Sequence, residues 1–380
     1  MENLRRKESD RFKFKALKPE AISLSQRELI KSSYVQPGES LPLVIEPAVA
    51  DVDLRDWVQS NREFVITSLR RHGGLLFRNF DVDSVVKFDQ FAVSWSPELM
   101  DYLDQHTPRT RISENIYTST EYPADHHVPF HSENSKNHIW PMKLWFFCQQ
   151  PAAQGGETPI ADNRRVFELL NPKIKERFIE KGVMYVRNFG EGVGLSWQTV
   201  FQTNSREQVE SYCRQANAQL EWKGGDRLRM EHVCPAVAVH PQTGDVVWFN
   251  QAHLFHISNV ERSARESLLS MFTEADLPSN SYYGDGSPIE SSVLDEVREV
   301  FSRVAVQFPW QRGDILMLDN MLVAHSRAPF KGPRKVFVAM AEPMSHQEIG
   351  TNTPKALANL SPGLERSDNP GYAIRDFFKP

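Results

Sequence analysis

The chain has 380 residues, 40% of them hydrophobic and 24% charged, a composition that is typical of a folded globular protein and excludes a disordered chain. Its net charge is −5 and its apolar runs are far too short to span a bilayer, so we expect neither nucleic acid nor a membrane among its partners. Three cysteines without metal-ligand spacing, and an N-terminus without an apolar segment, predict a cytoplasmic location.

The first 130 residues combine a polar start with two predicted helices. Residues 1–45 are polar, and we expect them to form an N-terminal arm. A helix is predicted over 53–71, because apolar residues recur there at helical spacing, and a strand over 74–80 follows a pair of glycines. A second helix is predicted over 82–95, and residues 96–130 should be rich in loops because they contain four prolines.

From residue 141 onward strands become the dominant element. In chain order we expect a strand at 143–148, a helix at 163–182 broken at Pro172, a helix at 207–218, a hairpin at 236–249, a helix at 288–304 and strands at 313–318 and 335–340. The segment 183–235 contains a glycine-rich loop and is predicted to be a lid insertion. We therefore expect one domain over 46–345, mainly β with outer helices, followed by a polar tail over 346–380.

Two histidines precede a glutamate by two residues, in His131-Ser-Glu133 and in His346-Gln-Glu348. Residues i and i+2 of a strand point to the same face, so either pair could present an imidazole and a carboxylate to one metal ion. His346 stands in the polar tail and no histidine follows it, so we interpret that pair as solvated surface. The pair of His131 and Glu133 is the better metal-site candidate.

A third metal ligand has to come from a later histidine, and His253 and His325 both follow a predicted strand. We favour His325, which comes shortly after the strand 313–318 and the turn Asp319-Asn320. Two histidines and one carboxylate on one face of a metal leave the other coordination positions open, an arrangement typical of non-heme iron(II) oxygenases.

Further motifs make the pattern more specific. Gly155-Gly-Glu-Thr158 follows the first pair of ligands, and Arg334 begins the last predicted strand nine residues after His325. In combination these motifs resemble the TauD/TfdA family of iron(II)- and 2-oxoglutarate-dependent oxygenases, from about Gly74 to about Ala341. The resemblance implies a double-stranded β-helix, a jelly roll of the cupin type, with Fe(II) as cofactor and 2-oxoglutarate and O2 as cosubstrates.

The resemblance also implies roles for individual residues. His131, Glu133 and His325 would hold the iron, and Thr158 and Arg334 would hold the distal carboxylate of 2-oxoglutarate. The planar, permanently charged guanidinium of Arg334 suits a carboxylate, although a salt bridge to a carboxylate of the protein is an alternative. For Thr158 the alternative is a plain turn hydroxyl.

Two positions depart from the commonest family pattern. Many members carry aspartate where this chain has Glu133; a carboxylate is kept, which argues against halogenation, because related halogenases lack one there. Taurine-type members carry a substrate-binding arginine where this chain has Val338, so taurine is an improbable substrate.

The substrate is indicated only by resemblance. The runs Trp145-Phe-Phe147 and Val247-Trp-Phe-Asn250 resemble hydroxylases that work beside peptide synthetases, as in syringomycin biosynthesis. The implied function is hydroxylation of an unactivated C–H bond of an amino acid in natural-product biosynthesis. The amino acid would be free or tethered to a peptidyl carrier protein.

Several side chains are candidates for contacts with the substrate. His127 could reach it or be a plain loop residue, and Trp248 and Asn250 could wall the pocket or belong to the core. Asn134 could orient Glu133 or be a turn residue, and Arg327 could bind a carboxylate of substrate or cosubstrate.

The sequence leaves three other functions open. The protein could be a desaturase or cyclase of the same family that acts on a different small acid. It could also be a non-catalytic binding protein of the cupin type, or a hydrolase that holds zinc at the same three residues.

Overall fold

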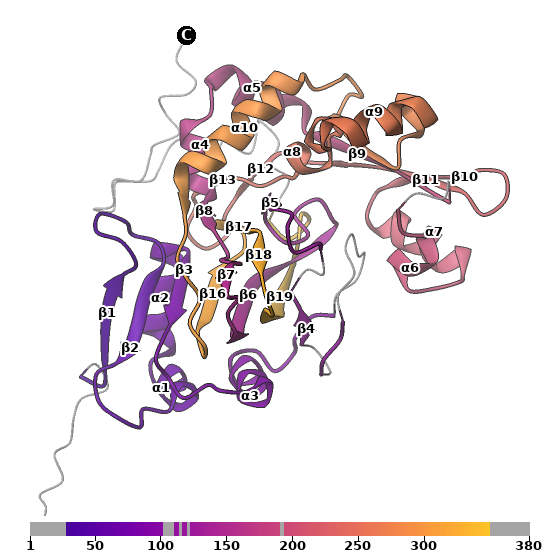
Figure 1. The fold of residues 1–380 in the computed structure, drawn as a ribbon. Helices are drawn as coiled ribbons and strands as arrows, with labels where there is room; N and C mark the ends of the chain where they lie inside the picture. The colour runs from indigo at the N-terminus through magenta and orange to yellow at the C-terminus, as the bar shows by residue number, and fades with distance from the viewer. Residues whose placement is uncertain (1–27, 102–109, 114–115, 120–121, 191–193, 350–380) are drawn as a thin grey trace, which may run out of the picture.

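Two β-sheets and the core between them organise the molecule in the computed structural model, which describes residues 28–101, 110–113, 116–119, 122–190 and 194–349 (Figure 1). The larger sheet has seven strands in the spatial order β1 (Ile30–Tyr34), β2 (Leu43–Pro47), β3 (Gly74–Phe77), β16 (Ile315–Asp319), β6 (Ile139–Gln150), β19 (Lys335–Ser345) and β4 (Tyr117–Thr118). The smaller sheet has four, in the order β15 (Ala305–Val306), β8 (Ile160–Asp162), β17 (Val323–Arg327) and β5 (Val128–His131). Pairing is antiparallel except between β2 and β3.

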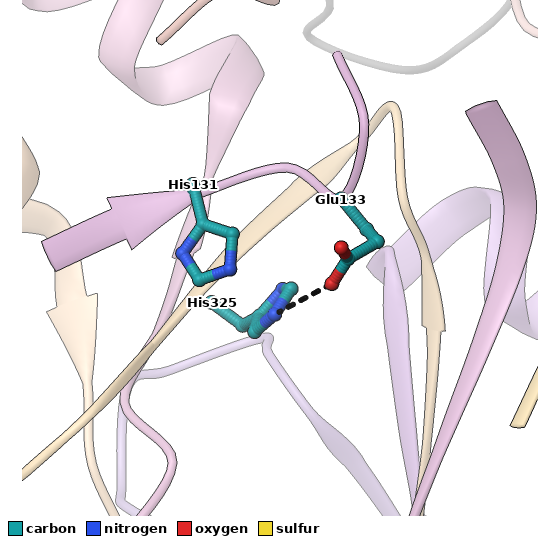
Figure 2. A group of neighbouring side chains, drawn as sticks. All are labelled: His131, Glu133 and His325. Atoms are coloured by element: carbon teal, nitrogen blue, oxygen red, sulfur yellow. Dashed lines mark ion pairs between the residues drawn. The ribbon is translucent and has the colours of Figure 1, made fainter. Parts of the chain in front are cut away.

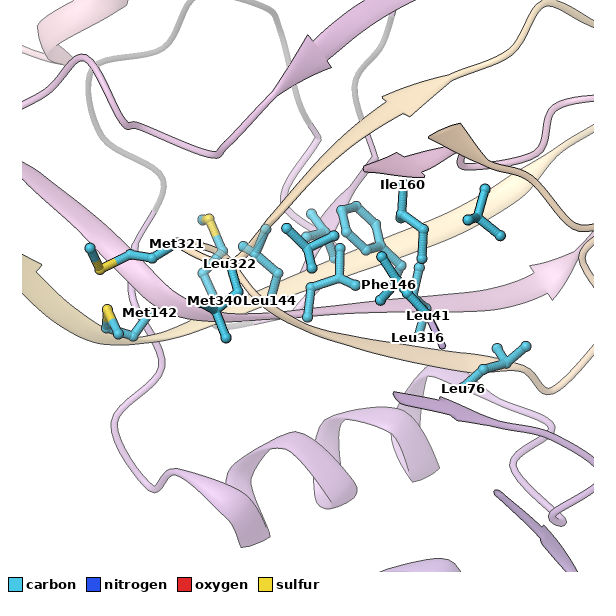
Figure 3. Packing of buried hydrophobic residues seen from close by; sticks show 14 of the residues in the cluster. Leu41, Leu76, Met142, Leu144, Phe146, Ile160, Leu316, Met321, Leu322 and Met340 are labelled. Carbon is cyan, nitrogen blue, oxygen red and sulfur yellow. The ribbon is translucent and has the colours of Figure 1, made fainter. Parts of the chain in front are cut away.

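A continuous apolar core fills the space between the two sheets (Figure 3). Phe146 and Leu144 of β6 and Met340 of β19 contribute from the larger sheet, and Ile160 and Val323 from the smaller one. Because side chains alternate along a strand, the opposite face of β6, with Trp145 and Phe147, is buried under helices instead. Two sheets around one core are the jelly roll that the sequence predicted.

Helices cover the outer faces of both sheets (Figure 1). The larger sheet is covered by α1 (Leu54–Ser60), α2 (Arg62–His72) and α3 (Val85–Trp95), whose apolar faces pack on β3, β6 and β16. The smaller sheet is covered by α4 (Asn163–Leu169), α5 (Pro172–Lys181), α8 (Ala252–Phe255) and α10 (Ser291–Val304). None of the helices within the described ranges combines the length and the apolar character that crossing a bilayer requires.

A third sheet lies beside the jelly roll and carries most of the predicted lid segment. Its strands have the order β10 (Gln219–Trp222), β11 (Leu228–Cys234), β9 (Val183–Phe189) and β14 (Ser279–Tyr283), and it packs against α6 (Trp197–Phe201) and α7 (Arg206–Gln215). The glycine-rich loop falls partly on residues 191–193, outside the described residues. That this segment closes over a ligand stays a prediction.

The remaining elements are short connections. The predicted hairpin is present as β12 (Val237–Val239) and β13 (Val246–Trp248), and β7 (Gln154–Gly155) pairs with β18 (Phe330–Lys331). Between α8 and β14 come the 3-10 turn η1 (Ile257–Asn259), helix α9 (Arg262–Met271) and the 3-10 turn η2 (Glu274–Asp276). Cys148, Cys213 and Cys234 are buried, and none of the three forms a disulfide within the described residues.

Two expectations about the elements were wrong. The predicted helix over 53–71 is two helices, because the side chain of Asn61 donates to the carbonyl of Trp57 and ends α1 there. Part of the predicted N-terminal arm is sheet, since β1 and β2 pair along their whole length and β2 also pairs with β3. Residues 1–27 of the arm and 350–380 of the tail lie outside the described residues.

Candidate active site

Three predicted metal ligands converge at one end of the smaller sheet (Figure 2). His131 ends β5 and His325 lies in the middle of β17, and the two residues are direct partners across this antiparallel pair. Their ring centroids are 4.3 Å apart. Glu133, two residues past His131, brings its Oε2 to 3.9 Å from Nε2 of His325. One donor atom from each residue lies within 4.8 Å of the other two, so the three donors surround a single point.

The chemistry of this donor set suits a divalent transition metal. Nδ1 of His131 lies 2.9 Å from the carbonyl oxygen of Pro129, and a carbonyl can only accept, so Nδ1 carries the proton. Nε2 of His131 is therefore the deprotonated nitrogen that can bind a metal. The separation of 3.9 Å between His325 and Glu133 is too long for a hydrogen bond. It fits two ligands of one ion, since each metal–ligand bond is about 2.1 Å long. Two imidazoles and one carboxylate on one side match the ligand set of non-heme iron(II).

His253, the alternative candidate for the third ligand, makes other contacts. His253 is 1% exposed, its Nε2 lies 2.9 Å from the carbonyl oxygen of Phe130, and its ring packs on Phe301. Burial lowers the pKa of His253 to about 3, so this imidazole is neutral. The structure thus brings together the three residues that the sequence analysis preferred.

A small cavity opens directly beside the two histidines. It is lined by His131, His325, Ser119, Val128, Phe146, Thr158, Ser326, Arg327 and Arg334. Thr158 and Arg334, the residues predicted to bind the distal carboxylate of 2-oxoglutarate, both contribute to its wall. Phe146 and Val128 supply apolar surface, so the cavity has an ionic end at Arg334 and apolar sides.

Arg334 is a half-buried cation whose hydrogen bonds go to neutral oxygen atoms. Its Nε donates to the carbonyl of Gly156 at 2.7 Å, Nη1 to the hydroxyl of Ser119 at 3.0 Å, and Nη2 to that of Thr158 at 3.5 Å. Burial lowers the pKa of Arg334 to about 10, and nearby Arg327 acts in the same direction. The side chain is still charged at neutral pH. Within the described ranges no salt bridge joins Arg334 to a carboxylate, although Glu157 is close enough to raise its pKa slightly.

Thr158 is oriented by a residue that the sequence analysis missed. Nε1 of Trp310 donates to Oγ1 of Thr158 at 3.2 Å, from the segment just before β16. With Trp310 and Arg334 both donating to this oxygen, the hydroxyl proton of Thr158 is left to point elsewhere. Thr158 is therefore equipped to donate to an anion in the cavity. The only sequence signal for Trp310 is its place ahead of Gly313-Asp314, and that signal does not reveal its partner.

Arg327 has contacts that the sequence did not predict. Its Nη1 donates to the carbonyl of Tyr122 at 2.8 Å, and its Nη2 donates to those of Pro123 and His126 at 2.6 and 2.7 Å. Both terminal nitrogens are thus used by the backbone of the segment 122–126. The side chain also lines the cavity, and its buried Nε has no partner among the described residues, so a contact with a carboxylate there stays a prediction.

The predicted substrate contacts are mostly structural. Trp248 is 1% exposed and packs on Phe178 at 5.0 Å, and Asn250 donates to the carbonyl of Ala236 and accepts from the amide of Ala252. Neither side chain lines the cavity. The aromatic and amide pattern of this strand end therefore reflects core packing and a turn.

The structure also bears on the expectations for Asn134, His127 and His346. Asn134 adopts a left-handed conformation with φ of 56°, and its carbonyl accepts from the amide of Asn137, so it is the turn residue of the two alternatives. His127 lies exposed on the segment leading into β5 and could still meet a substrate. His346 was wrongly interpreted as solvated: its ring lies 4.6 Å from Trp140, and burial lowers its pKa to about 4.

Comparisons with known proteins agree with this geometry. The profile of the family described as "Taurine catabolism dioxygenase TauD, TfdA family" matches residues 37–340. The dapdiamide synthesis protein DdaC of Enterobacter agglomerans is 41% identical over 276 residues, covering 73% of this chain and 84% of that protein. A clavaminate synthase-like protein of Arabidopsis thaliana is 28% identical over 322 residues, covering 80% and 92%. The crystal structure of PvcB from Pseudomonas aeruginosa is similar in fold, with a TM-score of 0.51, 13% identity and coverage of 84% and 92%.

Proposed function

The chain belongs to the TauD/TfdA family of iron(II)- and 2-oxoglutarate-dependent oxygenases, and we propose that it hydroxylates an unactivated C–H bond of an amino acid in a biosynthetic pathway. The observation that carries the reaction type is the grouping of His131, Glu133 and His325, two of which line a cavity together with Arg334. The 41% identity with a dapdiamide synthesis protein supports the biosynthetic setting. The three free, buried thiols fit a reducing compartment, and we propose the cytoplasm.

Each group of residues has a defined task in this proposal. His131, Glu133 and His325 hold the iron, which activates O2 together with the cosubstrate when it is bound. Arg334 and Thr158 hold the distal carboxylate of 2-oxoglutarate, by charge and by the hydroxyl proton of Thr158 respectively. Phe146 and Val128 exclude water from the side of the cavity. In the overall reaction one oxygen atom enters the C–H bond and the other enters succinate, with release of carbon dioxide.

The position of Val338 supports a substrate other than a simple sulfonate. Val338 is fully buried in β19, opposite Phe146, and belongs to the core between the sheets. An arginine cannot take its place without burying an extra charge, which is costly in an apolar core. We propose an amino acid as substrate, free or attached to a peptidyl carrier protein.

The test is a coupled-turnover assay. Purified protein, Fe(II) and 2-oxoglutarate are incubated in air with single amino acids, and in parallel with the same amino acids loaded on a carrier protein. Succinate release together with a product heavier by one oxygen supports the proposal. A product lighter by two hydrogens identifies a desaturase or a cyclase, and robust turnover of taurine refutes the substrate class.

A further inference from the structure

The carboxylate ligand is placed less directly by the sheet than the two histidines. His131 and His325 face each other across β5 and β17, so backbone pairing fixes both. Glu133 lies beyond the end of β5, in a turn whose ends are joined by a hydrogen bond from the amide of Ser135 to the carbonyl of Ser132 at 3.2 Å. Some other contact has to set the backbone of Glu133 relative to the histidines.

That contact comes from Asn320, which is fully buried in the turn between β16 and β17. The amide nitrogen of Glu133 donates to Oδ1 of Asn320 at 2.7 Å, and Nδ2 of Asn320 donates to the carbonyl of Glu133 at 2.8 Å. The second hydrogen of Nδ2 is directed to the carbonyl of Pro141, also at 2.8 Å. The carboxamide thus pairs with both backbone polar groups of a single residue, 187 positions away in the sequence.

Only a carboxamide satisfies this set of partners. The backbone of Glu133 offers one donor and one acceptor, and Pro141 offers a second acceptor. A carboxylate at position 320 could accept from the amide of Glu133 but would turn an oxygen toward two carbonyl oxygens. An apolar side chain would leave all three backbone groups without this partner.

Asn320 is itself held rigidly by its neighbour. Its amide donates to the carbonyl of Met142 at 3.0 Å. The preceding Asp319 is fully buried and contacts Lys143 at 2.9 Å and His240 at 3.2 Å. Burial alone would raise the pKa of Asp319, but Lys143 and His240 bring it well below its usual range, so the carboxylate stays charged. A buried ionic network therefore fixes the turn that carries Asn320.

We propose that Asn320 is a positioning residue that sets the location of the Glu133 carboxylate relative to the two imidazoles. Asn320 comes five residues before His325, in the turn that leads into β17. Its hydrogen bonds therefore join the segment that carries Glu133 to the turn that precedes the strand of His325. The inference rests on the proposed ligand set, with Glu133 as a member. Asn320 does not touch the metal or the substrate, and its effect passes through Glu133.

The experiment measures metal affinity, independently of turnover. Fe(II), and Co(II) as a spectroscopic probe, are titrated anaerobically into wild-type protein and into Asn320→Asp, which is nearly isosteric. We expect affinity to fall about 10- to 100-fold, as is usual when a partner of a metal ligand is lost. Asn320→Ser tests the same contact with a smaller side chain, and circular dichroism establishes that each variant is folded.

Asn188→Asp is a matched control. Its amide is also buried and donates to two carbonyls, those of Ala275 and Leu277, but it lies in β9 of the third sheet, away from the proposed ligands. We expect this variant to lose stability and to keep the metal affinity of the wild type. An equal loss of affinity in both variants would mean that general destabilisation explains the effect, and the proposal would be overturned.

A double-mutant cycle separates this inference from the ligand assignment. If Asn320 acts through Glu133, Asn320→Asp should have little further effect on metal affinity once Glu133→Ala has removed the carboxylate. Full additivity, or folded Asn320 variants with wild-type affinity, would overturn the positioning role. If Glu133→Ala alone left metal affinity unchanged, the proposed ligand set would fail first.

Discussion

Replacing Arg334 by lysine should make the binding of 2-oxoglutarate sensitive to pH in a range where the wild-type protein is not. Burial already brings the pKa of Arg334 down to about 10, so the wild-type cation persists to well above neutrality. The usual pKa of lysine is about two units below that of arginine. The same burial would therefore bring the titration of Arg334→Lys into the range just above neutrality, and binding should weaken there as pH rises.

The size of the effect follows from the contacts of the guanidinium. Arg334→Leu removes a half-buried cation with three hydrogen-bonding partners, and leaving a charge without its partner costs up to about 3–5 kcal/mol when that charge is buried. This corresponds to about two to four decades in the affinity for 2-oxoglutarate. Arg334→Lys should lose about one decade at neutral pH, because an ammonium cannot reproduce the planar fork.

The assay is a set of 2-oxoglutarate titrations between pH 6.5 and pH 9, read by succinate release and by the visible charge-transfer absorption of the anaerobic iron complex. Metal affinity, measured separately, should be unchanged in Arg334→Lys. An affinity of Arg334→Leu for 2-oxoglutarate equal to that of the wild type would refute the assignment of Arg334 as the partner of the carboxylate.

Three further changes probe the same site. Trp310→Phe removes one hydrogen bond to Thr158, worth about 1 kcal/mol, so the KM for 2-oxoglutarate should rise about fivefold with metal affinity unchanged; an unaltered KM would mean that Trp310 does not orient the hydroxyl. Glu133→Ala should weaken iron binding and abolish native turnover. Mass spectrometry in the presence of chloride tests whether this variant forms a halogenated product instead. Hydroxylation by Glu133→Ala at the rate of the wild type would contradict the ligand set. Arg327→Leu should free the segment 122–126, seen as faster amide hydrogen exchange there; unchanged exchange would show that the three carbonyl contacts do not hold it.

The grouping of His131, Glu133 and His325 could be predicted from the sequence because each residue stands in a short motif beside a strand. His131 ends β5, Glu133 follows two residues later, and His325 lies in the strand after one with a strong apolar pattern. Arg334 directly precedes the long strand β19. These spacings and the apolar strand pattern are visible in a single sequence, whereas the turn that places Glu133 is not.

Contacts between distant segments could not be predicted in this way. Asn134 is next to Glu133 in sequence, yet the amide that contacts Glu133 belongs to Asn320, which reaches it only through sheet pairing. Trp310 and Thr158 are likewise 152 residues apart. The contacts of Arg327 are of the same kind, because its terminal nitrogens donate to backbone carbonyls 201 to 205 positions away.

The N-terminal strands illustrate a similar limit for the fold. β1 is largely exposed and has no alternating apolar pattern, so nothing local distinguishes it from an extended arm. Its strand character comes from pairing with β2, which in turn pairs with β3 in the centre of the domain. Edge strands of this kind are defined by their neighbours in space.

The most direct test of the site as a whole is an anaerobic titration of the iron(II)-loaded protein with 2-oxoglutarate, followed by visible absorption. Wild-type protein should develop a weak charge-transfer band that saturates with one equivalent of 2-oxoglutarate. His325→Ala should show no band, and Arg334→Leu should require a far higher concentration to reach saturation. Absence of the band in the wild-type protein, or a band that persists unchanged in His325→Ala, would contradict the assignment of the iron and 2-oxoglutarate sites.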